Sequence, residues 1–61
     1  MNGLYVIFYE DDQKQTHTEH IYANTLHFCL EQFNQIMQVK GIKKPKIKRM
    51  TEYQKVAVVN L

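Results

Sequence analysis

The sequence predicts one α+β domain over residues 1–61, with a single helix packed on a face of a small antiparallel or mixed three- to four-stranded sheet. Three observations predict this class. Runs of β-branched and aromatic residues near both ends indicate strands, apolar residues at helical spacing indicate one helix between them, and 61 residues are too few for two separate cores. The expected order is β-β-α-β, with β-β-α-β-β as the alternative.

The N-terminal third carries the pattern of a β-hairpin. Leu4–Tyr9 has the strand-forming sequence LYVIFY, and the polar cluster Glu10–Gln13 predicts a turn. Lys14–Tyr22 then predicts a second strand, which should pair antiparallel with the first because the connection is short. Since this second strand is mostly polar, we expect it at an edge of the sheet.

A helix is expected over residues 25–40. Its apolar positions recur at helical spacing and are Leu26, Cys29, Leu30, Phe33, Ile36 and Met37. Asn24 or Thr25 can supply the N-cap oxygen. Gly41 is placed to take the left-handed conformation after the last turn, with Ile42 reaching back to Met37 in a Schellman closure.

The C-terminal third is less regular. Lys46–Thr51 and Val56–Val59 both favour strands, although Ile47, Met50 and Tyr53 also fit a helical spacing. Strand is the preferred prediction because four residues as rich in valine as Val56–Val59 require a sheet. Whether residues 46–61 form one bent strand or two strands stays open.

Charge is unevenly distributed along the chain. The net charge is +2, but five of the six acidic residues lie in residues 1–31, whereas six basic residues and no acid lie between Lys40 and Arg49. This basic segment has two interpretations. It could bind an anion, or it could be a solvated connector whose charge complements the acidic hairpin.

The residues that usually carry catalysis are missing or badly placed. The chain has no serine, and Cys29 lies on the apolar stripe of the helix, where a thiol is normally a small hydrophobe. Asp11 and Asp12 lie at a predicted turn, without the shielding that general acid–base catalysis requires. We therefore predict a protein that is not an enzyme and uses no cofactor.

The three histidines do not form a metal-binding pattern. His17 and His20 would point to opposite faces of a strand. His27 and Cys29 would lie about 200° apart around a helix, too far for one ion. Because a zinc site needs converging ligands, we predict no metal.

Compartment is indicated by two features. The apolar run Leu4–Tyr9 is too short for a membrane span or a signal peptide. A lone cysteine, Cys29, is typical of a reducing compartment. We expect a soluble, cytoplasmic protein without a membrane segment.

The first strand is apolar on both faces, yet the chain offers one helix to cover them. We expect Tyr5, Ile7 and Tyr9 to lie on the uncovered face, and the helix to carry a second apolar shoulder at Phe28 and Val39. These five residues form the predicted protein interface. A second copy of the chain or a different protein would cover it.

The preferred hypothesis is a non-enzymatic interaction module, homodimeric, that binds and modulates or inhibits a protein partner. The alternative is a small basic nucleic-acid-binding protein that uses a tyrosine face and the segment 40–49. Its predicted contact residues are Lys43, Lys44, Lys46, Lys48, Arg49 and Tyr53. The short β-β-α-β pattern without catalytic residues is similar to accessory proteins of phages and mobile elements, a likeness that rests on no motif and carries no residues over.

Overall fold

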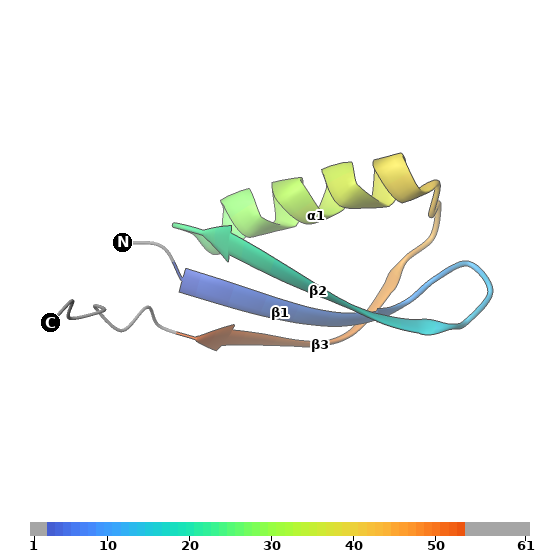
Figure 1. Cartoon of the computed structure of the whole chain (residues 1–61), viewed down its shortest axis with the longest axis horizontal. Coiled ribbons are helices and arrows are strands. Elements are labelled where there is room, and N and C mark those ends of the chain that lie inside the picture. Colours follow the sequence, from blue (N-terminus) through green and yellow to red (C-terminus); the bar gives the residue numbers. More distant parts are fainter. Residues whose placement is uncertain (1–2, 54–61) are drawn as a thin grey trace, which may run out of the picture.

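The computed structural model describes residues 3–53, which form three strands and one helix (Figure 1). The elements, in chain order, are β1 (Gly3–Glu10), β2 (Thr16–Ala23), α1 (Leu26–Lys40) and β3 (Lys46–Tyr53). This order confirms the predicted β-β-α-β arrangement. The strand predicted at Val56–Val59 lies outside the described residues. No helix in residues 3–53 is long and apolar enough to cross a membrane.

The sheet has the order β2-β1-β3, with both neighbours antiparallel to the central β1. Because β2 and β3 pair with its two edges, the β1 side chains on both faces lie between side chains of the neighbouring strands, which favours apolar residues on both faces. The register places Val6 between His20 of β2 and Thr51 of β3. β2 is an edge strand, as its polar sequence predicted.

The β1–β2 loop is longer than the sequence predicted, so β2 begins at Thr16 rather than at Lys14. The Asp11 carboxylate accepts hydrogen bonds from the backbone amides of Gln13 and Gln15, at 2.8 and 2.9 Å. Lys14 adopts a positive φ of 64°, which turns the chain away from the extended conformation. These local contacts end the pairing of β1 with β2 at Glu10 and Thr16, so β2 starts two residues later than predicted.

Both predicted ends of the helix are confirmed. Thr25 is the N-cap, and its Oγ1 accepts a hydrogen bond from the Phe28 amide at 3.1 Å. At the other end Gly41 has a φ of 73°, which residues with a β-carbon rarely adopt. The Ile42 amide donates to the Met37 carbonyl at 2.9 Å, which completes the Schellman closure.

The core lies between α1 and one face of the sheet. Tyr5, Ile7 and Tyr9 of β1 pack against Cys29 and Phe33 of α1, and the rings of Tyr9 and Phe33 meet edge to face at 5.1 Å. The other buried members of this cluster are Ile21, Ala23 and Met37.

The prediction that Tyr5, Ile7 and Tyr9 form an exposed interface is therefore wrong. All three are buried beneath the helix. Two tyrosines can be buried because their hydroxyl groups reach carboxylates at the margin of the core: Tyr5 donates to Glu52 at 3.2 Å and Tyr9 to Glu19 at 2.8 Å. The face that α1 leaves uncovered is the opposite one.

β3 is one strand, and it contains an irregularity next to the paired residues Phe8 and Tyr9. Phe8 pairs with Arg49, but Tyr9 pairs with Ile47, so Lys48 is an extra residue in β3. Lys48 contacts Glu10 and Arg49 contacts Phe8, and both of these partners lie on the uncovered face of β1. The bulge thus brings two consecutive cations to one face.

Replacing Gly41 tests the helix closure. Gly41→Ala should lower the free energy of unfolding by about 1 kcal/mol, because alanine pays a steric penalty in the left-handed conformation. Gly41→Asn should lower it less, since asparagine tolerates this conformation better. Urea denaturation measures both, and an alanine variant as stable as the parent would contradict the assignment.

Candidate functional site

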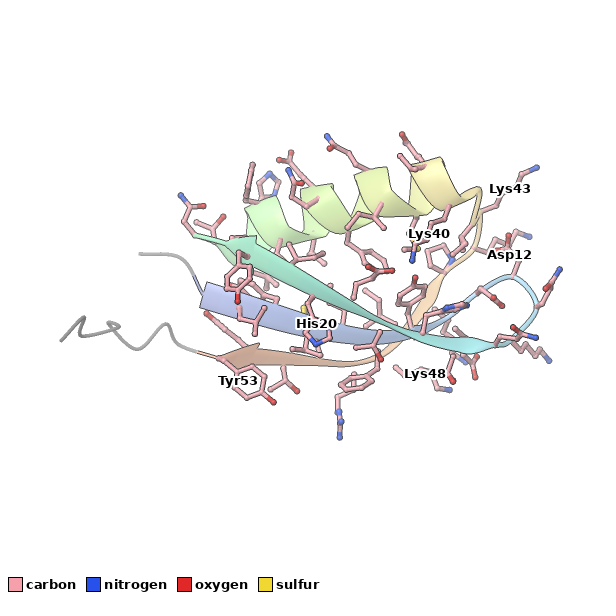
Figure 2. All side chains as sticks on the ribbon, in the orientation of Figure 1. Asp12, His20, Lys40, Lys43, Lys48 and Tyr53 are labelled. Atoms are coloured by element: carbon pink, nitrogen blue, oxygen red, sulfur yellow. The ribbon has the colours of Figure 1, made fainter. Side chains whose placement is uncertain are left out.

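The helix does not cover the face of the sheet opposite α1, and we call this face the open face. Figure 2 shows Tyr53 and Lys48 on the side of the sheet away from the helix. By the strand register, the open face consists of Leu4, Val6, Phe8 and Glu10 from β1, Thr16, Thr18, His20 and Tyr22 from β2, and Lys46, Lys48, Arg49, Thr51 and Tyr53 from β3.

Two exposed tyrosines flank Leu4 at one end of the open face. The register aligns Tyr22, Leu4 and Tyr53 across the three strands. Tyr22 is 68% exposed and Tyr53 is 55% exposed. Since neighbouring strands lie about 5 Å apart, the two tyrosine backbones are separated by about 10 Å. Their rings offer two aromatic surfaces to a ligand that lies across the sheet.

Basic side chains occupy the other half of the open face. The Arg49 guanidinium lies 4.5 Å from the centroid of the Phe8 ring, a cation–π contact that holds the charge over the sheet. Lys48 Nζ lies 3.8 Å from a carboxylate oxygen of Glu10, at the long end of an ion pair between partly exposed groups. Lys46 is the cross-strand neighbour of Glu10. Three cations therefore share this surface with one carboxylate.

The centre of the open face is not a bare apolar patch. Val6 is only 8% exposed, and Leu4 and Phe8 are half-buried among the side chains of the flanking strands. What remains accessible is mainly the tyrosine rings, His20, the threonines and the basic groups. A ligand on this face would meet aromatic rings and positive charge more than aliphatic surface.

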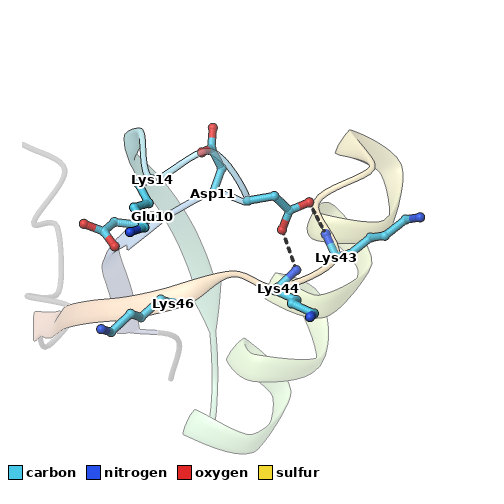
Figure 3. A pocket seen from close by; sticks show the side chains of 7 residues that line it. Glu10, Asp11, Lys14, Lys43, Lys44 and Lys46 are labelled. Carbon is cyan, nitrogen blue, oxygen red and sulfur yellow. Dashed lines mark hydrogen bonds between the residues drawn. The ribbon is translucent and has the colours of Figure 1, made fainter.

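A second feature lies at the far end of the sheet, where the β1–β2 loop meets the α1–β3 connector. The residues there enclose a hollow of about 400 Å³ (Figure 3). Its lining is Glu10, Asp11, Asp12, Lys14, Lys43, Lys44 and Lys46. Asp12 joins the two segments, because its carboxylate accepts hydrogen bonds from the backbone amides of Lys43 and Lys44, at 2.9 and 2.6 Å.

The aspartates of this hollow are held ionised by their own hydrogen-bond donors. The His17 side chain, 2.8 Å from Asp11, is the main cause that lowers the pKa of that carboxyl, and the loop amides add to it. The amides of Lys43 and Lys44 lower the pKa of Asp12. The acidic hairpin thus contacts the basic connector through backbone amides as well as through long-range charge.

On the helix side, ionisable groups have structural partners. Glu19 accepts hydrogen bonds from the Tyr9 hydroxyl and from Lys40 Nζ. Burial, followed by the hydrogen bond to Glu19, raises the pKa of Tyr9. Cys29 is fully buried, and burial raises the pKa of its thiol, the opposite of what a nucleophile needs. In residues 3–53 no cluster of three or more His, Cys, Asp or Glu residues could hold a metal ion.

The structure separates the residues that the sequence assigned to two interfaces. Of the predicted protein interface, only Phe28 and Val39 are exposed, at 43% and 89%. Of the predicted nucleic-acid contacts, the β3 residues lie on the open face, whereas Lys43 and Lys44 lie in the connector. The β3 residues are Lys46, Lys48, Arg49 and Tyr53.

Sequence reasoning missed Tyr22 and Phe8 as members of this face. Strand alternation carried a signal for both. Tyr22 has the parity of Thr18 and His20, which indicates the polar side of an edge strand, and Phe8 has the parity of Leu4 and Val6. The signal was incomplete because alternation does not say which side of β1 the helix covers.

Comparisons with known proteins give this chain no relative: no protein-family model, no curated protein and no solved structure matches it. The accessible groups of the open face and of the hollow therefore carry the functional argument.

Acid titration tests the link between Asp12 and the connector. Because its pKa is lower in the folded protein, the Asp12 carboxylate contributes stability that is present at neutral pH and is lost as pH falls below about 4. Asp12→Asn should lower stability at pH 7 and make unfolding between about pH 4 and pH 2 less dependent on pH. Thermal unfolding followed by circular dichroism at several pH values measures this, and identical pH profiles would contradict the assignment.

Proposed function

We propose that this protein is a non-enzymatic binder of single-stranded nucleic acid and that the open face is its binding surface. One observation carries the proposal: two exposed tyrosines and three basic side chains share the face of the sheet that the helix leaves uncovered. Bases would stack on Tyr22 and Tyr53, and phosphates would meet Lys46, Lys48 and Arg49.

A single strand fits this surface better than a duplex. Stacking on a side-chain ring requires an unpaired base, because the faces of paired bases are covered by their neighbours in the helix. The tyrosines lie on the face of a sheet and not on a projecting helix or ribbon, the elements that enter a major groove. Stacking and charge together give binding that depends little on sequence and strongly on salt.

The charge of the open face favours a polyanion over a second copy of the same face. Glu10 is the one acidic residue there, and it already contacts Lys48. Two open faces packed together would bring their basic residues into one interface without enough acidic partners, and such unpaired charge is costly to bury. The buried Cys29 thiol also fits the reducing cytoplasm, where single-stranded nucleic acid is available.

Removal of each tyrosine ring tests the proposal. Tyr22→Ala and Tyr53→Ala should each weaken binding to a fluorescently labelled oligonucleotide by about 1–3 kcal/mol, or about 5- to 150-fold in Kd, because one stacked base is lost. Phe28→Ala is the matched control, since it removes an exposed aromatic ring from the helix instead. Fluorescence anisotropy at low salt measures all four proteins.

The same titrations at several salt concentrations test the phosphate contacts. Arg49→Gln should reduce the slope of log K against log salt by about 0.7, the contribution of one single-strand phosphate. A parent protein without salt-sensitive binding, or an equal loss in the Phe28 control, would contradict the proposal.

A protein interface on the helix is the second candidate function. Phe28 and Val39 are exposed on α1, at 43% and 89%, and lie about 20° apart around the helix axis, on the same side of the helix. A homodimer through this surface, or a protein partner modulated by it, would use the helix and leave the open face accessible.

Light scattering at micromolar concentration tests the homodimer. A dimeric mass for the parent and a monomeric mass for Val39→Glu would support it, because a buried charge at an apolar interface is unfavourable. The thermal midpoint serves as the control for folding, since Val39 makes little contact with the core. A monomeric parent would contradict the homodimer.

A further inference from the structure

The hollow between the β1–β2 loop and the α1–β3 connector brings together four lysines from three segments of the chain. Lys14 comes from the loop, Lys43 and Lys44 from the connector, and Lys46 from the first position of β3. The loop is distant in sequence from the connector and β3, which follow each other, and hydrogen bonds from the Lys43 and Lys44 amides to Asp12 hold the loop against the connector (Figure 3). The cluster is therefore a product of the fold.

In the described part of the chain, the four lysines form no ion pair with a carboxylate. Within residues 3–53, none of their ammonium groups has a carboxylate oxygen within 4.0 Å, whereas Lys40 and Lys48 do have such partners. The three carboxylates at the hollow are engaged elsewhere. Asp11 contacts His17, Glu10 contacts Lys48, and Asp12 contacts backbone amides. Four lysines thus line the hollow beside three carboxylates and form no ion pair with them, and the side chain of Lys43 extends away from the hollow (Figure 3).

The connector amides already hold a carboxylate of the chain itself. Two consecutive amides, those of Lys43 and Lys44, point at the Asp12 carboxylate at 2.9 and 2.6 Å. Two successive backbone amides that donate to one carboxylate favour negative charge at that point. The lysine side chains around it extend the same preference to a larger, multiply charged group.

We propose that this hollow binds a phosphate-bearing anion with several charges, of the oligophosphate class. Its volume of about 400 Å³ falls in the range of small-ligand sites. A lysine contacts a phosphate as a point charge. Lysines spread around a rim can therefore each contact a different phosphate of an extended chain, whereas one compact ion would reach fewer of them.

The ligand could be a free oligophosphate or the backbone of a bound strand. Lys46 belongs both to the rim of the hollow and to the open face, so the two surfaces adjoin at the start of β3. A strand stacked on Tyr22 and Tyr53 could run along β3 and place later phosphates in the hollow. This inference extends the proposed function but does not require it.

Isothermal titration calorimetry with inorganic tripolyphosphate at low salt tests the site without any nucleic acid. The parent should bind in a saturable way, and the double variant K14Q/K44Q should weaken binding by about tenfold, because two charge contacts are lost. Lys43 is left unchanged because its side chain extends away from the hollow in Figure 3. Circular dichroism confirms that the variants fold.

Arg49→Gln is the comparison for a positive charge removed outside the hollow. It removes a positive charge from the open face, outside the lining of the hollow, so each charge removed there should weaken tripolyphosphate binding less than each charge removed from the hollow. No saturable binding by the parent at about 1 mM tripolyphosphate, or the same loss per charge in R49Q and K14Q/K44Q, would overturn the inference.

Oligonucleotide binding by the same variants distinguishes the two sources. If strand phosphates occupy the hollow, K14Q/K44Q also weakens oligonucleotide binding, and tripolyphosphate competes with the strand. If the ligand is a free oligophosphate, oligonucleotide binding is unchanged in this variant. Tripolyphosphate binding by a protein that binds no oligonucleotide would support the hollow and remove the proposed function.

Discussion

The packing of α1 on one face of β1 is the contact on which the rest of the structure depends. β1 is apolar on both sides, and the chain has one described helix to cover them. The helix takes the side of Tyr5, Ile7 and Tyr9, where Phe33 meets the Tyr9 ring. Burial of two tyrosines there is possible because Glu19 and Glu52 accept their hydroxyl hydrogens at the margin of the core.

This choice of side determines what the open face presents. Its central positions, Leu4, Val6 and Phe8, are buried or half-buried between the side chains of the flanking strands. Arg49 lies over Phe8, and the β3 bulge places Lys48 on the same surface. The accessible groups of the open face are thus mainly aromatic and basic. This composition suits a negatively charged strand whose bases stack on the rings better than it suits a second β-sheet.

The basic segment is divided by the fold into two surfaces. Lys43 and Lys44 precede Pro45 in the connector, where their amides hold Asp12. Lys48 and Arg49 follow in β3 and belong to the open face, with Lys46 at the junction between the two. A continuous charge run in the sequence therefore becomes a hollow at the end of the sheet and a line of cations along its edge.

The helix and the strands could be predicted from local sequence, because the signals for them act over a few residues. Thr25 and Gly41 marked the ends of the helix, and the β-branched and aromatic residues of β1 marked a strand, since capping and strand preference act over a few residues. The β2 boundary was misplaced because the Asp11 turn extends the loop. Which side of β1 is buried could not be predicted in this way, because both faces are apolar and strand alternation does not distinguish them. The packing of α1 selects the side of Tyr5 and Tyr9, where the tyrosine hydroxyl groups reach Glu52 and Glu19.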